Sequence, residues 1–302
     1  MSDQSAIHTE GLTKHYGKVR ALVDLDVDIR AGEIFGYLGP NGSGKTTTIR
    51  TMLDEIRPTA GRASILGMDT HDKAVEIREH IGYVPGDLAL YPNLTGKDTL
   101  TYFANLRGGV DWSYVDEIAE RLDADLEKKV GDLSSGNRQK VGVIQAFMNR
   151  PDVLIMDEPS SGLDPLIQRE FQKMMREVAA EGCAIFLSSH TLSEVQRVAD
   201  RVGIIRHGHL VAVESVSELR SKAMRRVELE LDSQAEASVF EAVPGTSDVT
   251  VGNHHVVMFF EGDMGALLRA ATERYTIVDI STQEADLEEI FLTYYHDEEV
   301  AV

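Results

Sequence analysis

The segment from Gly39 to Thr47 carries the clearest chemical signal in the sequence. It contains the pattern G-x-x-x-x-G-K-[ST]. Glycines in this pattern let backbone N–H groups surround the α- and β-phosphates of a nucleotide, Lys45 reaches the β- and γ-phosphates, and Thr46 offers a hydroxyl to Mg²⁺. The segment therefore predicts a site for a nucleoside triphosphate and magnesium. The residues expected around the phosphates are Gly39, Asn41, Gly42, Ser43, Gly44, Lys45, Thr46 and Thr47.

Two adjacent carboxylates, Asp157 and Glu158, follow the apolar segment from Val153 to Met156. A parallel strand buried on both faces has this composition, and the carboxyl ends of such strands are where open α/β sheets bind ligands. A solvated loop or a helix cap is the simpler explanation for two neighbouring acids, but the apolar residues before them weigh against it. We expect Asp157 to hold Mg²⁺ through water and Glu158 to activate water for attack on the γ-phosphate.

A second anion site is predicted where Leu133 to Lys140 begins a helix, because Ser134 and the free N–H groups there can bind phosphate. One chain would then carry two phosphate half-sites but a single phosphate loop. A two-fold dimer resolves this, since each chain's helix end can close over the nucleotide of the other. From these residues alone, a simple helix N-cap explains the segment equally well.

The elements that must position these residues follow from the hydrophobic pattern. Ile34 to Leu38 is typical of a short buried strand, and Lys45 to Leu53 of a helix whose N-terminus faces the anion. Before them, Ala6 to Leu12 and Val19 to Ile29 alternate as half-buried antiparallel strands do. Tyr16 lies in the turn between those strands, where an aromatic ring is more often a packing residue but could stack on a purine base.

The middle of the chain predicts a helical insert and then a return to alternating helices and strands. Thr95 and Asp98 have the spacing of a capping box. After the insert, the alternation argues for a parallel sheet with both faces covered. The expected helices are 45–53, 72–80, 99–106, 113–122, 134–148, 165–180 and 192–199, and the expected strands are 61–66, 81–85, 153–159, 184–188, 202–206 and 209–213.

The composition changes after about Lys222. From there to Val302 the sequence has five Lys or Arg residues and seventeen Asp or Glu residues, so this part carries −12 of the formal net charge of −20. Its pattern predicts the β-α-β-β-α-β order of a ferredoxin-like split motif, with a hairpin at Gly252-Asn253. The expected strands include 227–231 and 275–280, and the expected helices are 233–242, 264–274 and a last one at 287–295. Another small α+β unit would fit the pattern equally well.

The bulk composition limits the partners and the compartment. A net charge of −20 over 302 residues repels nucleic acid and anionic lipid head groups, so we expect no nucleic-acid partner. The single Cys183 excludes a disulfide framework and is expected to be a small core residue. We see no secretory signal and no apolar window of about eighteen residues, so we expect no direct membrane insertion.

Together these motifs resemble those of the ATPase subunit of an ABC transporter. The matching segments are Gly39 to Thr47 (Walker A), Leu133 to Asn137 (the signature), Val153 to Glu158 (Walker B), Ser161 to Asp164 (the D-loop) and His190 (the switch histidine). They cover roughly the first 220 residues and are much more specific together than the phosphate loop alone.

The resemblance implies a fold and a site. The fold would be α/β, that of a P-loop NTPase of ABC type. Residues 1–220 would form the ATP-binding domain, with a mixed sheet core, an antiparallel β layer and a helical subdomain at about 93–150. Residues 221–302 would form a small acidic α+β accessory domain. ATP and Mg²⁺ would be the cofactors. Lys45, Glu158 and His190 would be catalytic, and Thr46 and Asp157 would bind the metal. Tyr16 would stack on adenine, Asp164 would lie near the nucleotide, and Ser134 and Gly136 would act across a dimer.

The resemblance also implies partners. We expect a homodimer that sandwiches two ATP molecules and drives a separate integral membrane permease, so the subunit would be cytoplasmic and peripheral on the inner face of the cell membrane. The segment from Asp286 to Tyr295 is similar to the tails of ATPases paired with ABC-2-type permeases, which predicts an exporter of drugs, antibiotics or lipid-like molecules. An amphipathic helix packed on its own domain would give the same spacing.

Three positions depart from the family pattern. Gly86 followed by Asp87 stands where the family usually has a glutamine that contacts Mg²⁺ and relays the nucleotide state to the permease. Ser135 and Asn137 replace a glycine and a glutamine of the signature. We therefore expect a working but slower site across the dimer, and coupling through other atoms, either those of Asp87 or a water molecule.

Two other functions remain open at this point. A non-transport ABC ATPase of translation or DNA repair would be expected to carry two phosphate loops or a long coiled coil, and the sequence has neither. A regulatory module that senses ATP without hydrolysing it is disfavoured by the presence of Glu158 and His190.

Overall fold

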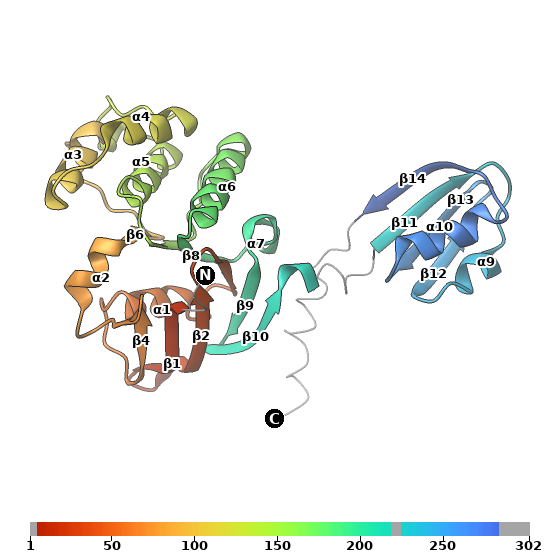
Figure 1. The fold of residues 1–302 in the computed structure, drawn as a ribbon, viewed down its shortest axis with the longest axis horizontal. Coiled ribbons are helices and arrows are strands. Elements are labelled where there is room, and N and C mark those ends of the chain that lie inside the picture. Colours follow the sequence, from red (N-terminus) through yellow and green to blue (C-terminus); the bar gives the residue numbers. More distant parts are fainter. Residues whose placement is uncertain (1–4, 219–224, 284–302) are drawn as a thin grey trace. The chain divides into compact units, whose positions relative to one another are not determined.

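The computed structural model describes residues 5–218 and 225–283. The chain divides into two compact units, Met1–Val213 and Glu214–Val302. The sequence pattern places the change near residue 220, within a few residues of this division. Each unit has its own hydrophobic core, and Figure 1 shows the elements of each.

A six-stranded sheet with the order β10-β9-β3-β8-β7-β6 forms the centre of the first unit. Strands β3, β8, β7 and β6 are parallel neighbours, and β9 runs parallel to β3 on the other side. This confirms the parallel sheet that the alternating pattern predicts. The strands are β3 Ile34–Leu38, β6 Ile81–Val84, β7 Val153–Asp157, β8 Ala184–Ser189, β9 Arg201–Arg206 and β10 His209–Ser215.

The register of this sheet brings the chemical residues to one edge. Leu38 of β3 pairs with Ser189 of β8, and Asp157 of β7 pairs with Ser188. Because the strands are parallel, the phosphate loop, the Asp157 carboxylate and the segment after β8 all follow the carboxyl ends of neighbouring strands. Four helices of this unit follow individual strands: α1 Lys45–Met52, α2 Ala74–His80, α6 Pro165–Ala180 and α7 Leu192–Val198.

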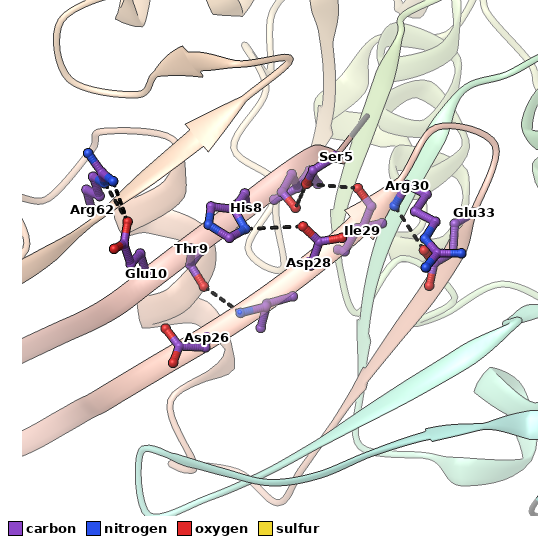
Figure 2. A network of polar contacts seen from close by, with 12 residues as sticks. Ser5, His8, Thr9, Glu10, Asp26, Asp28, Ile29, Arg30, Glu33 and Arg62 are labelled. Carbon is purple, nitrogen blue, oxygen red and sulfur yellow. Dashed lines mark hydrogen bonds and ion pairs between the residues drawn. The ribbon is translucent and has the colours of Figure 1, made fainter. Parts of the chain in front are cut away.

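An antiparallel sheet with the order β2-β1-β4-β5 forms a second layer. Its strands are β1 Ser5–Tyr16, β2 Val19–Arg30, β4 Ala60–Ile65 and β5 Met68–Asp69. Figure 2 shows polar contacts that join these strands on their exposed side: Arg62 of β4 lies 2.5 Å from the Glu10 carboxylate of β1, and His8 lies 3.2 Å from Asp28 of β2. The opposite side supplies Ile7, Leu25 and other residues to the core. The predicted antiparallel layer is thus present.

The helical insert lies between β6 and β7. It contains α3 Gly96–Leu106, α4 Trp112–Arg121, a short 3₁₀ turn Val130–Asp132 and α5 Ser135–Phe147, which lie together in Figure 1. The predicted capping box is confirmed: the Asp98 N–H donates to Thr95 Oγ1 at 3.0 Å, and the Thr95 N–H donates to the Asp98 carboxylate. The insert was expected to hold no strand, and it has only an isolated bridge between Thr95 and Lys129.

Cys183 lies just before β8 and is buried, as the sequence predicts. Burial raises the pKa of its thiol to about 12. The thiol is therefore protonated at neutral pH and packs as a small apolar group.

The second unit has the order β11-α9-β12-β13-α10-β14, which confirms the β-α-β-β-α-β pattern. Its sheet has the order β12-β13-β11-β14, and the three neighbouring pairs are antiparallel. This is the strand order of a ferredoxin-like split motif. The elements are β11 Arg225–Leu231, α9 Ala237–Glu241, β12 Thr246–Val251, β13 His255–Phe260, α10 Met264–Thr272 and β14 Ile277–Gln283.

Several boundaries in this unit differ from the sequence prediction, and hydrogen bonds explain two of them. Helix α9 was expected from Ser233, but Asp232 accepts a hydrogen bond from the Thr276 N–H at 3.1 Å, which holds this segment beside the start of β14. Strand β14 was expected from Tyr275, but the Tyr275 N–H donates to Ala271 at the end of α10. A long-range contact therefore holds Asp232 outside α9, whereas a local bond keeps Tyr275 at the end of α10. The predicted helix at 287–295 and the segment from Asp286 to Tyr295 lie outside the described residues.

Candidate nucleotide-binding and hydrolysis site

A cavity of about 630 Å³ lies at the edge of the central sheet, between the phosphate loop, the end of β7 and the segment after β8. Its lining includes most of the residues predicted to bind the phosphates and the metal. The lining residues are Val19, Arg20, Ala21, Asn41, Gly42, Gly44, Lys45, Thr46, Thr47, Gly86, Asp157, Glu158, Ser161, His190 and His207.

The phosphate loop is closed tightly on itself. Gly44, the residue before α1, has a φ of 118°, and a Cβ there would lie 2.7 Å from the backbone oxygen of Ala21, so only glycine fits without strain. Lys45 is only 6% exposed, and its Nζ donates to the Gly39 carbonyl at 2.7 Å. The same Nζ lies 3.4 Å from Glu158 Oε1. The lysine ammonium is therefore held at the base of the cavity next to the acid.

Asp157 is buried at the end of β7 and is fixed by two hydroxyl groups. Thr46 Oγ1 donates to its Oδ2 at 2.7 Å, and Ser188 Oγ donates to its Oδ1 at 2.5 Å. Sequence reasoning missed Ser188, although it follows the buried run of β8. The strand register, which pairs Ser188 with Asp157, is what brings it to the site.

Glu158 has a left-handed backbone conformation, with a φ of 52°. Its N–H donates to the Ser188 carbonyl at 3.1 Å. The carboxylate is 23% exposed and lies between two nitrogen-bearing side chains, because its Oε2 is 2.5 Å from His190 Nδ1 while its Oε1 faces Lys45. A non-glycine residue in this conformation is uncommon, and such strain often accompanies a functional position. Here it turns the carboxylate toward the cavity instead of along the strand.

Gly86 also lines the cavity. A Cβ at this position would lie 3.2 Å from Asp157 Oδ2, so the backbone of residue 86 approaches the buried carboxylate closely. Asp87 is exposed and is not among the lining residues. The segment therefore reaches the site with its backbone, and no side chain extends from residue 86.

Six predicted residues lie outside this cavity. Gly39 and Ser43 belong to the phosphate loop but serve its packing, since a Cβ on Gly39 would lie 2.6 Å from Ser43 Oγ. Tyr16 is 48% exposed, with Lys14 Nζ 5.1 Å from its ring centre, and it pairs with Val19, which does line the cavity. The other three are Ser134, Gly136 and Asp164.

Those three residues lie at two helix N-termini. The Ser134 hydroxyl accepts from the Asn137 N–H at 3.3 Å and caps α5. Asp164 accepts from two N–H groups at the start of α6. A Cβ on Gly136 would lie 2.2 Å from the Gly162 carbonyl, so the signature and the D-loop of one chain are in contact. The cavity is formed without any of the three.

The turn between β9 and β10 brings His207 to the cavity, and sequence reasoning missed it. The next residue, Gly208, donates its N–H to the Ser43 carbonyl at 2.9 Å and accepts from the Val23 N–H at 2.9 Å. The turn is therefore fastened both to the phosphate loop and to β2. Nothing in the local sequence distinguishes this turn from any other; only its long-range hydrogen bonds place His207 here.

Two absences among the described residues bear on partners and metals. No helix in 5–218 or 225–283 combines the length and the apolar character needed to cross a membrane. Within the same ranges, no group of three or more His, Cys, Asp or Glu side chains is arranged to hold a metal ion. A magnesium ion at Thr46 and Asp157 would thus need further ligands from the nucleotide and from water.

The chain is similar to known proteins along most of its length. A family model described as ABC transporter matches residues 22–161. The chain is 34% identical over 291 residues to the bacitracin transport ATP-binding protein BcrA of Enterococcus faecalis, and the match covers 94% of each chain. It is 29% identical to a solved ATP-binding subunit of an ABC transporter, with a TM-score of 0.66, covering 72% of this chain and 92% of that one.

A further solved structure, the dimeric bacterial ABC transporter cassette MJ0796, is 24% identical to this chain and matches it with a TM-score of 0.62. The match covers 70% of this chain and 98% of that one, and this likeness shows the fold. The fold and the site together are those of an ATP-binding cassette, which confirms the predicted fold class. The chain belongs to the family of ABC transporter ATP-binding proteins. It is an ATPase, as the sequence predicts.

Proposed function

We propose that this ATPase is the subunit that powers a separate membrane permease, and that it hydrolyses ATP with Glu158 as the residue that activates water. The observation that supports this most directly is the convergence of Lys45, Thr46, Asp157, Glu158 and His190 on one cavity. Three separate segments of the chain supply these five side chains. Their chemical types are those that phosphoryl transfer to water requires.

Magnesium fits the donor set of this cavity. The Thr46 hydroxyl and the Asp157 carboxylate are oxygen ligands, which Mg²⁺ takes together with water and phosphate oxygens. When bound, the ion neutralises charge on the β- and γ-phosphates. Ser188 holds Asp157 by a hydrogen bond at 2.5 Å and so fixes the orientation of the carboxylate that would face the ion.

Glu158 and its neighbours divide the work at the γ-phosphate. Lys45 binds the β- and γ-phosphate oxygens as a point charge at the end of the phosphate loop. Glu158 orients a water molecule and accepts its proton as the water attacks. His190 bonds to Glu158 through Nδ1, which holds the ring beside the carboxylate. We propose that Nε2 of the same ring contacts the γ-phosphate.

A homodimer would complete the site. Ser134 and Gly136 lie outside the cavity of their own chain, at the N-terminus of a helix of thirteen residues, α5, where backbone N–H groups favour an anion. We propose that they close over the ATP of a second copy, so that two chains enclose two nucleotides. The dimeric state of the MJ0796 cassette supports this assembly.

The permease partner is inferred from the relatives. BcrA is named for the transport of bacitracin, which supports a role in the export of drugs, antibiotics or lipid-like molecules. We propose an ABC-2-type permease as the partner, with the ATPase held on the inner face of the cell membrane through it. Tyr16, next to Val19 at the cavity, is proposed to stack on adenine.

Two experiments test this function. Phosphate release from ATP by the purified chain should require Mg²⁺, and ATP binding without any phosphate release would instead support a regulatory sensor. Purification of the tagged chain from membranes, followed by mass spectrometry, should identify an integral membrane permease. Recovery with soluble partners alone would contradict the transport role.

A further inference from the structure

An ion-pair cluster joins the helical insert to helix α6. Arg121, the last residue of α4, donates from Nε to Glu170 Oε1 at 2.6 Å, and its Nη1 lies 2.6 Å from Glu177 Oε2. Both glutamates belong to α6 and are seven residues apart, so they lie two turns apart on the same face. Arg121 is 22% exposed, which shields these contacts partly from water. We call this cluster the Arg121 brace.

Two carboxylates of α6 share the single positive charge of Arg121, and a third carboxylate, Glu117 of α4, lies 3.9 Å from its Nη1. Hydrogen bonding to Arg121 holds the pKa of the Glu177 carboxyl below its usual value, so the carboxylate stays ionised at neutral pH. The planar guanidinium presents several N–H groups in fixed directions and can therefore bind two carboxylates at once. A lysine ammonium carries the same charge but lacks this fixed geometry.

The insert also contacts the segment that leads from β7 to α6, and α6 itself, at two further points. Gln139 of α5 is buried and donates from Nε2 to the Pro159 carbonyl at 3.0 Å, directly after Glu158. Phe147, at the end of α5, packs edge-on against Phe171 of α6, with 6.0 Å between the ring centres. Helix α5 is thus held at both ends, and the brace adds an attachment through α4, which lies beside α5 in the insert (Figure 1).

We propose that Arg121 is a positioning residue for the half-site formed by Ser134 and Gly136. By holding α4 on α6, it fixes the orientation of the insert, and the insert in turn aims the N-terminus of α5 at the nucleotide of a second copy. Arg121 does not line the cavity, so it acts on the completion of the dimer and not on nucleotide binding by one chain. This inference rests on the proposed dimer.

The test compares Arg121→Gln with Lys173→Gln. Lys173 lies on α6 and pairs with Glu177 at 3.8 Å, so its variant removes the same charge and weakens a contact to the same carboxylate without touching the insert. Three quantities are measured for each full-length variant: the dissociation constant of a fluorescent ATP analogue, the protein concentration at half-maximal specific ATPase activity, and the dimer dissociation constant by analytical ultracentrifugation with ATP in a Glu158→Gln background.

We expect the affinity of Arg121→Gln for the ATP analogue to stay within about twofold of that of the parent chain. The protein concentration at half-maximal activity and the dimer dissociation constant should rise by about 2- to 30-fold, the usual range for a residue that couples two sites. Lys173→Gln should match the parent chain in all three measurements. Arg121→Lys should restore part of the loss, because it keeps the charge but loses the two-carboxylate geometry.

The outcomes separate the two proposals. If the Glu158→Gln chain itself stays monomeric with ATP, the proposed dimer fails and the role of Arg121 fails with it. If that chain dimerises but Arg121→Gln behaves like Lys173→Gln, only the positioning role is overturned. An equal loss of nucleotide affinity in Arg121→Gln would show a general structural defect, which also overturns it.

Discussion

At the scale of single residues, the Lys45–Glu158 pair decides how the site can work. The two side chains are 3.4 Å apart, and the lysine is almost completely buried. A triphosphate carries more charge than a carboxylate and offers more oxygens, so a bound γ-phosphate competes with Glu158 for the ammonium. We infer that nucleotide binding releases the Glu158 carboxylate toward water at the moment when it is needed as a base.

Glu158→Gln should therefore retain ATP binding and lose turnover. Glutamine keeps the size of the side chain but cannot accept the proton of the attacking water, and the loss of a general base typically lowers the rate by about 10²- to 10⁴-fold. Phosphate release and binding of a fluorescent ATP analogue measure the two properties separately. Glu194→Gln is the matched control, because Glu194 bonds to Ser189 close by but does not line the cavity. Hydrolysis at the parent rate in Glu158→Gln would remove Glu158 from its role.

Lys45→Ala should weaken nucleotide binding itself. A hydrogen bond to a charged group contributes about 1.5–3 kcal/mol, so we expect the dissociation constant of ATP to rise by about tenfold to a hundredfold. Lys18→Ala removes the same charge from the exposed β1–β2 turn and should leave the constant unchanged. An unchanged constant in Lys45→Ala would count against the assigned site.

The sequence reveals the site residues that belong to local motifs and misses those that depend on register. Lys45, Thr46, Asp157 and Glu158 are recognisable because glycines or an apolar run stand directly beside them. Ser188 and His207 have no such neighbours, and they reach the site only because β8 pairs with β7 and because the β9–β10 turn bonds to Ser43. Pairing between strands far apart in the chain cannot be derived from local patterns.

At the scale of helices and strands, local capping explains where several elements begin. Helix α6 runs over the predicted range because Asp164 caps it and Pro165 occupies its first position. Helix α3 likewise follows the capping box at Thr95. The start of α9, which the sequence misplaces, follows a segment that is held by the distant bond between Asp232 and Thr276. Local chemistry thus predicts the first kind of boundary and not the second.

Thr95→Ala should destabilise the helical insert. Loss of an N-cap hydroxyl typically costs about 1 kcal/mol, so we expect the midpoint of a chemical denaturation curve to fall accordingly. Thr101→Ala is the control: it removes the same atoms from the middle of α3, where Oγ1 bonds to the Lys97 carbonyl and alanine is the better helix former. A Thr95→Ala curve that coincides with the parent curve would contradict the capping role.

At the scale of the whole molecule, residues of two chains would form each ATP site in the proposed dimer. Gly136→Ala should disable the half-site given to the partner, since the added Cβ would lie 2.2 Å from the Gly162 carbonyl. Lys45→Ala disables the half-site that binds ATP within its own chain. Each homodimer would therefore be inactive, whereas a mixed dimer would hold one complete site.

Mixing the two variants should restore ATPase activity. With random pairing, half of the dimers are mixed and each has one complete site of two, so about a quarter of the parent activity is expected. The control is Lys45→Ala mixed with the double variant Lys45→Ala, Gly136→Ala, a mixture in which every phosphate loop is defective. No recovery in the first mixture would argue against a site shared between chains.

The burial of Cys183 makes the native chain a convenient background for fluorescent reporters. Its thiol stays protonated and covered at neutral pH, so a cysteine introduced at an exposed position such as Lys18 would react selectively with maleimide dyes. Separate batches of the Lys18→Cys chain could carry a donor or an acceptor dye without removal of the native cysteine. Energy transfer in their mixture would then report the association of two chains in real time as ATP is added and consumed.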